Sequence, residues 1–182
     1  GFPTPQIAEV TRTFRPLGLG VSNLGALLMT LGLPYDSADG RSLAATLMAI
    51  LTGQAYLRSA LLAQERGAFA GFAANREPML RVIQQHVAAL DALLPTLPLA
   101  QQLHAAAVTI WQRAQVNGVE SGFRNAQVTV CAPTGTISFL MDCDTTGIEP
   151  ELALVKYKHL AGGGMMKIVN GAVDAALTRL RY

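Results

Sequence analysis

Charged and aromatic residues are both scarce in this sequence. Only 14% of the 182 residues are charged and 6% are aromatic, whereas 51% are hydrophobic. Because alanine and leucine supply much of the hydrophobic share, the composition favours helices around an aliphatic core. The net charge is +2 and the basic residues are scattered, so no basic surface for a nucleic acid polymer is indicated.

Long apolar runs are also absent. No stretch reaches 18 consecutive apolar residues, and the strongest candidate, residues 24–50, is interrupted by Asp36 and Asp39. A membrane span is therefore not expected. The sequence opens at Gly1 with neither a methionine nor the charged and apolar regions of a signal peptide, so we expect a piece of a longer protein.

Cysteine and histidine are too few and too dispersed for a disulfide framework or a metal site. The two cysteines are Cys131 and Cys143, without Cys-x-x-Cys spacing. The histidines, His86, His104 and His159, are far apart and are expected to be structural or exposed to solvent. We predict no metal, and a reducing cytoplasm fits the cysteine content best.

Residues 1–122 have the pattern of a mostly helical segment. Apolar residues recur at helical spacing, Asp36 and Asn75 are suitable N-caps, and Gly32 and Gly67 are suitable C-terminal glycines. The proline-containing stretch 93–99 is expected to be a connector. The predicted helices cover residues 1–15, 24–31, 36–66, 75–90 and about 103–118.

Two short strands are predicted, one within this helical region and one after it. Pro16–Asn23 alternates glycine with aliphatic residues, which suits a buried strand, and Gln127–Cys131 is rich in β-branched residues. We expect these two to be parallel neighbours. A second strand of the C-terminal part is predicted at Leu152–Tyr157, followed by a flexible break at Gly162–Gly164 and a helix at Asn170–Arg181.

The segment Pro-Thr-Gly-Thr-Ile-Ser, residues 133–138, follows a predicted strand and precedes an apolar helical turn. Successive main-chain N–H groups, a glycine, three hydroxyl groups and a helix start are what a phosphate-binding loop needs. The lysine and spacing of a P-loop are missing. From these residues alone, an ordinary strand-to-helix turn remains the alternative.

The surrounding phrases resemble the ribonucleotide reductase large chain, in the version carried by vitamin B12-dependent enzymes. The resemblance covers essentially the whole sequence, in order. It rests on residues 131–138, 141–150, 154–164 and 167–170, and upstream on 14–20, 23–28, 34–37, 71–72, 75–76, 79–83 and 124–127.

That resemblance implies an α/β fold, in which residues 1–182 form one helix-rich fragment of a ten-stranded α/β barrel, with 123–182 carrying the phosphate loop, a second strand and a terminal helix. Thr134, Gly135, Thr136, Ile137 and Ser138 would hold the substrate phosphates, mostly through main-chain N–H groups. It implies a ribonucleoside-diphosphate reductase that forms 2′-deoxyribonucleotides by a radical mechanism.

The same resemblance implies adenosylcobalamin as the cofactor. The partners would be a ribonucleotide substrate, the remainder of the same catalytic chain, a thiol reductant such as thioredoxin, and a second copy in a homodimer.

The family's Asn-x-Cys-x-Glu motif, which supplies the radical cysteine and a carboxylate base, does not occur here, and neither does its C-terminal cysteine pair. We therefore expect no catalytic residue in this sequence, and an isolated fragment that is inactive and only marginally soluble. Cys131 is interpreted as a small buried hydrophobe. Cys143 falls where relatives also tend to have cysteine, and its redox role is open.

The turn Gly147–Pro150 would support the inner wall of the barrel. Alternatively, it is a structural turn with Glu149 in a buried ion pair. Two other functions stay open: a reductase whose radical comes from a separate subunit, and a non-catalytic helical interaction module.

Overall fold

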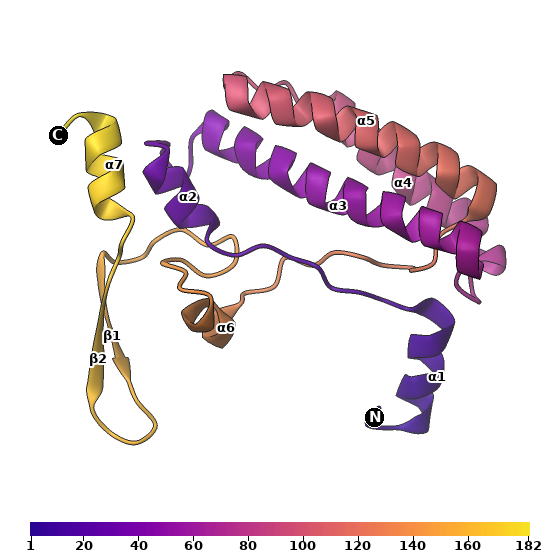
Figure 1. The fold of residues 1–182 in the computed structure, drawn as a ribbon, viewed down its shortest axis with the longest axis horizontal. Coiled ribbons are helices and arrows are strands. Elements are labelled where there is room, and N and C mark those ends of the chain that lie inside the picture. The colour runs from indigo at the N-terminus through magenta and orange to yellow at the C-terminus, as the bar shows by residue number, and fades with distance from the viewer. The chain divides into compact units, whose positions relative to one another are not determined.

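The computed structural model describes all 182 residues, which pack as two compact units. The helical unit comprises residues 1–19 and 42–130, and the hairpin unit comprises residues 20–41 and 131–182. The elements along the chain (Figure 1) are α1 (Pro5–Phe14), α2 (Leu24–Thr30), α3 (Ala38–Arg66), the 3-10 helix η1 (Ala73–Asn75), α4 (Arg76–Asp91), α5 (Pro98–Ser121), α6 (Gly135–Leu140), β1 (Val155–His159), β2 (Met165–Val169) and α7 (Val173–Leu180).

The core of the helical unit lies where α3, α4 and α5 run alongside one another (Figure 1). Tyr56, Trp111 and Phe123 meet there, with the Tyr56 and Phe123 rings edge to face at 5.5 Å between centroids. The indole N–H of Trp111 donates to the carbonyl of Ala49 at 2.9 Å, so the buried polar atom is satisfied. Helices cover most of residues 1–122, as the sequence predicted.

Helix α5 is longer at both ends than the predicted range. It begins at Pro98, which occupies the first turn where its missing N–H costs nothing, and it passes through Gly118 to Ser121. Gly118 does not end the helix: a Cβ there would lie 2.2 Å from Cζ of Phe123. The glycine gives space to a core ring, and Gly122, with φ of 71°, is the actual C-cap.

The two predicted parallel strands pair through only one bridge. Leu19 and Thr129 form an isolated parallel bridge, with hydrogen bonds from the Leu19 N–H to the Val128 carbonyl and from the Val130 N–H to the Leu19 carbonyl. The parallel direction is correct. The expected burial of Pro16–Asn23 is wrong, because residues 16–20 are exposed and the segment pairs along one edge alone.

The hairpin unit contains the only sheet of the chain, an antiparallel pair of β1 and β2 in which Tyr157 faces Lys167. The predicted second strand is confirmed in type, but it lies three residues later at its start and two later at its end. The expected flexible break is a turn that joins the strands, with Gly163 and Gly164 at φ of 86° and 92°. Strand β2 was not predicted.

These elements make a helix-rich α/β chain, and the ten strands of a complete barrel are not seen in it. None of its helices combines the length and the apolar character that crossing a membrane requires.

Candidate functional site

The predicted phosphate loop lies at the start of helix α6. Thr134 is the N-cap residue and adopts a left-handed conformation, with φ of 53° and ψ of 34°. Such a conformation costs a non-glycine residue about 1–2 kcal/mol. Gly135, by contrast, has no positive φ, so the unusual backbone geometry of the loop belongs to the threonine.

The five predicted site residues divide into an outward and an inward group. Gly135, Thr136 and Ile137 are exposed. Their main-chain N–H groups lie in the first turn of the short helix, where no helix carbonyl can accept from them. A left-handed residue followed by helical residues makes these N–H groups converge, which is the geometry of an anion-binding nest. The outward group therefore has the donors that an anion requires.

The inward group is held by a third hydroxyl from a distant segment. The Oγ of Ser22 lies 2.9 Å from Oγ1 of Thr134 and 3.0 Å from Oγ of Ser138, and the latter two atoms are 2.9 Å apart. Ser138 is buried and also donates to the Thr134 carbonyl at 2.5 Å. Of the three loop hydroxyls, only that of Thr136 stays exposed to solvent.

The turn that contains Gly147 supports the same loop. The N–H of Gly147 donates to Oγ1 of Thr134 at 2.6 Å. A Cβ on Gly147 would lie 2.6 Å from the Ala132 carbonyl oxygen. Glu149 is exposed and accepts from the hydroxyl of Thr146 at 2.5 Å. The alternative of a buried Glu149 ion pair is therefore wrong, because the carboxylate is satisfied by its own turn.

Residues next to Ser22 bind the turn-containing stretch after helix α6. Oδ1 of Asn23 accepts from the Thr145 N–H at 3.0 Å, and Oγ1 of Thr145 accepts from the Ala26 N–H at 3.1 Å. Gly25 permits this close approach, since a Cβ there would lie 2.6 Å from the Glu149 carbonyl oxygen. The start of helix α2 is thus fixed to residues 145–149.

A buried carboxylate organises the approach to the hairpin. The side chain of Glu151 is 7% exposed and accepts from Lys156 Nζ at 3.0 Å, from Asn170 Nδ2, and from the N–H groups of Leu152 and Ala153. Burial raises the pKa of Glu151, but the hydrogen bonds from Asn170, Lys156 and Ala153 and the charge of Lys156 outweigh burial and hold this pKa below its usual value.

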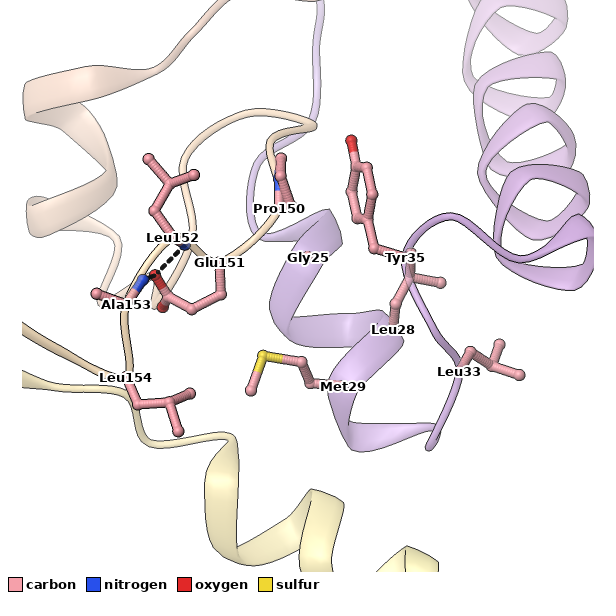
Figure 2. A pocket seen from close by; sticks show the side chains of 10 residues that line it. All are labelled: Gly25, Leu28, Met29, Leu33, Tyr35, Pro150, Glu151, Leu152, Ala153 and Leu154. Carbon is pink, nitrogen blue, oxygen red and sulfur yellow. Dashed lines mark hydrogen bonds between the residues drawn. The ribbon is translucent and has the colours of Figure 1, made fainter.

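Two cavities of the hairpin unit border this carboxylate. One, of about 300 Å³, is lined by α2 and by residues 150–154, and Figure 2 shows Met29 and Leu154 on its walls and Glu151 turned back to the N–H groups of Leu152 and Ala153. The other, of about 350 Å³, includes Ser138, Lys156 and Lys158 among its lining residues. The ammonium group of Lys158 lies 3.8 Å from the ring centroid of Phe139 in α6.

Neither cysteine is paired. Cys131 is exposed, which contradicts its interpretation as a buried hydrophobe, because the segment that follows Val130 has left the paired stretch. Cys143 is half-buried and lies 3.8 Å from the carbonyl of Met141. No His, Cys, Asp or Glu residues gather into a group that could hold a metal ion.

Comparison with known proteins identifies the family. The sequence matches the family described as ribonucleotide reductase, barrel domain, over residues 1–182. The chain belongs to this ribonucleotide reductase barrel-domain family. The resemblance inferred from its motifs is therefore confirmed.

Curated relatives in the ribonucleotide reductase family match the whole chain. A vitamin B12-dependent ribonucleotide reductase of Rhodopirellula baltica is 54% identical over all of this chain and 17% of its own length. One of Streptomyces avermitilis is 52% identical over 19% of its length. A vitamin B12-dependent ribonucleoside-diphosphate reductase of Mycobacterium tuberculosis is 32% identical over 92% of this chain and 18% of its own length. The chain thus spans about a fifth of these relatives.

Sequence reasoning missed the residues that support the loop. Ser22 and Asn23 belong to a stretch interpreted as a buried strand, and Glu151, Lys156 and Asn170 were given no role. The only available signal was a pair of adjacent polar residues within an otherwise apolar and glycine-rich segment.

Proposed function

We propose that this chain is part of a ribonucleotide reductase that reduces ribonucleotides to 2′-deoxyribonucleotides by a radical mechanism, with adenosylcobalamin as the radical source. The high identity along the whole chain to reductases named as vitamin B12-dependent supports this activity over that of a reductase with a separate radical-generating subunit. The chain lacks the Asn-x-Cys-x-Glu motif, so the radical cysteine and the base would come from elsewhere in the full-length enzyme.

Within that enzyme, residues 134–138 would bind the substrate phosphates. The observation that carries this role is that Gly135, Thr136 and Ile137 are exposed at a helix start, while the hydroxyls of Thr134 and Ser138 turn inward. The phosphate would be held by main-chain N–H groups, with one added hydrogen bond from the Thr136 hydroxyl. Because these main-chain N–H groups donate to the phosphate, the loop would recognise the phosphate rather than the base.

The cavities described above do not fit the cobalamin. Adenosylcobalamin, with its corrin ring and nucleoside arms, is several times larger than the spaces of about 300 and 350 Å³ in the hairpin unit. No residue of this chain is therefore assigned to the cofactor. When bound to the full-length enzyme, the cofactor would supply the radical.

The proposed partners follow from the proposed activity. They are the ribonucleotide, the remainder of the catalytic chain, a thiol reductant such as thioredoxin, and a second copy of the enzyme in a homodimer. A cytoplasmic location stays a prediction from the cysteine content. A purely helical interaction module is disfavoured, because such a module has no use for the β1–β2 hairpin and the parallel bridge at Leu19.

Two variants of the full-length reductase test the phosphate loop. A side chain at Gly135 meets nothing within 4 Å, so Gly135→Val should fold and should weaken nucleotide binding by blocking the approach of the phosphate. Thr136→Val removes one hydroxyl bond to a charged partner, on the order of 1–2 kcal/mol, and should weaken binding less.

The measurement is a titration of ribonucleotide binding with both variants. Equal losses would contradict the main-chain cradle, and no loss with either variant would make the loop an ordinary strand-to-helix turn. The backbone conformation of Gly135 does not enter the comparison, because its φ is not in the left-handed region.

A further inference from the structure

We infer that Ser22 is a positioning residue for the phosphate loop, acting through Thr134 and Ser138 rather than touching the nucleotide itself. This inference rests on the phosphate-binding role proposed above for residues 134–138. It assigns a function to a side chain that precedes the loop by more than a hundred residues in the sequence.

The geometry requires something to hold Thr134. A left-handed conformation is unfavourable for a β-branched residue, and Thr134 adopts it one residue before the N–H groups that face solvent. The direction of those N–H groups depends on this one pair of dihedral angles. Any relaxation of Thr134 toward an ordinary conformation would turn the donors away from a common point.

Ser22 is placed to prevent that relaxation. Its Oγ is within 3.0 Å of the hydroxyl oxygens of both Thr134 and Ser138, the first and the last residue of the loop. It also lies 3.2 Å from the N–H of Gly147, which donates at 2.6 Å to Thr134. One hydroxyl therefore joins the two ends of the loop and the turn behind it.

The segment that carries Ser22 is itself fixed. Asn23 accepts from the Thr145 N–H at 3.0 Å, and the Ala26 N–H donates to the side chain of Thr145 at 3.1 Å. A hydroxyl on a mobile segment could not restrain the loop. Here the adjacent residues hold Ser22 against the same stretch of chain that supports Gly147.

The test measures ribonucleotide reduction by the full-length enzyme with Ser22→Ala and Ser22→Cys. With Ser22→Ala, the KM for the ribonucleotide should rise by roughly tenfold, as loss of about two hydrogen bonds predicts. The kcat should change less than about twofold, because no reacting group is contacted. Ser22→Cys, with its weaker hydrogen bonds, should give an intermediate KM, and it carries the test if the alanine variant fails to fold.

Inorganic pyrophosphate is the probe for the loop itself. Its inhibition constant as a competitor of the ribonucleotide should rise by the same factor as the KM. The matched control is Ser59→Ala, which removes another serine hydroxyl that makes two hydrogen bonds to Asn125 in the helical unit. This control should leave both the KM and the inhibition constant unchanged.

The inference and the proposed function fail in different ways. If Gly135→Val weakens nucleotide binding but Ser22→Ala does not, the positioning role is wrong and the phosphate loop stands. The positioning role is also wrong if Ser59→Ala raises the KM as much as Ser22→Ala. If neither Gly135→Val nor Ser22→Ala changes nucleotide or pyrophosphate binding, the phosphate loop itself is wrong.

Discussion

The imidazole ring of His86 is stacked on the indole ring of Trp111, with centroids 5.2 Å apart and planes inclined by 25°. Both residues border a cavity of about 260 Å³ in the helical unit, together with aliphatic residues of α3 and α4. Partial burial lowers the pKa of His86 below its usual value of 6.5. Burial therefore favours the neutral imidazole.

Stability of the helical unit should accordingly fall on mild acidification. Between the lowered pKa of His86 and pH 6.5, the unfolded chain binds more protons than the folded chain, so the free energy of unfolding decreases as the pH falls. The decrease is complete below the folded pKa. Urea unfolding of the chain at pH 7 and pH 5, followed by the fluorescence of its single tryptophan, measures the effect.

The matched variant is His86→Gln, which keeps a polar side chain but does not titrate. It should lose part of the difference in unfolding free energy between pH 7 and pH 5. An unchanged difference would mean that other groups cause the acid sensitivity.

Gly118→Ala should destabilise the helical unit strongly. The new Cβ would lie 2.2 Å from Cζ of Phe123, a ring with no exposed surface, so the ring must leave its place in the core. Overpacking of this kind costs about 1–3 kcal/mol. Thermal unfolding compares this variant with Gly135→Ala, where a Cβ meets nothing, and only Gly118→Ala should lower the midpoint.

The behaviour of Gly118 also explains how far the sequence could lead. Helices were predictable because their periodicity and caps are local, whereas the phosphate-binding role of residues 133–138 was predicted from local composition together with the family resemblance. The end of α5 was not, since Gly118 is small to make room for Phe123, a tertiary demand. Strand β2 was missed because Gly162–Gly164 has the composition of a linker as well as that of a hairpin turn.

The supports of the candidate site lay beyond local patterns altogether. Ser22 meets Thr134 across 112 residues, and no periodicity relates them. Glu151 meets Asn170 across 19 residues through the hairpin, whose second strand was not predicted. The residues proposed to face the ligand were therefore identified from the sequence, whereas those that hold them in place required the structure.

Glu151→Gln should destabilise the hairpin unit at neutral pH. The change removes the charge that accepts from Lys156, on a side chain that is 7% exposed, and hydrogen bonds to charged groups contribute about 1.5–3 kcal/mol. The control is Glu77→Gln, whose side chain is 72% exposed in its pair with Arg76, and which should cost less than about 1 kcal/mol.

The same carboxylate predicts a pH dependence. Because the pKa of Glu151 is lowered on folding, its contribution to stability is fully present above the usual value of 4.5 and is lost as the pH falls through the lowered pKa. Unfolding of Glu151→Gln and of the unaltered chain across pH 3 to 6 measures this dependence. Equal acid sensitivity of Glu151→Gln and the unaltered chain would contradict the assignment.

Gly147→Ala should damage both the fold and the proposed site. Gly147 has φ of 47°, and a Cβ would lie 2.6 Å from the Ala132 carbonyl oxygen, which is main chain and cannot move aside cheaply. Gly163→Ala separates the two causes, since Gly163 also has positive φ, at 86°, but a Cβ there meets nothing within 4 Å. Conformational strain alone costs about 1–2 kcal/mol, so any greater loss with Gly147→Ala measures the clash.

Nucleotide binding by the full-length reductase distinguishes the two glycines further. Displacement of Gly147 would break the hydrogen bond of 2.6 Å that its N–H donates to Oγ1 of Thr134. Because the left-handed conformation of Thr134 would lose this support, the exposed N–H groups of the loop would diverge. Gly147→Ala should therefore weaken ribonucleotide binding roughly tenfold or more, as loss of a strong hydrogen bond predicts. Gly163→Ala, in the turn between β1 and β2, should leave ribonucleotide binding unchanged, and equal losses in the two variants would show that binding responds to stability rather than to the conformation of Thr134.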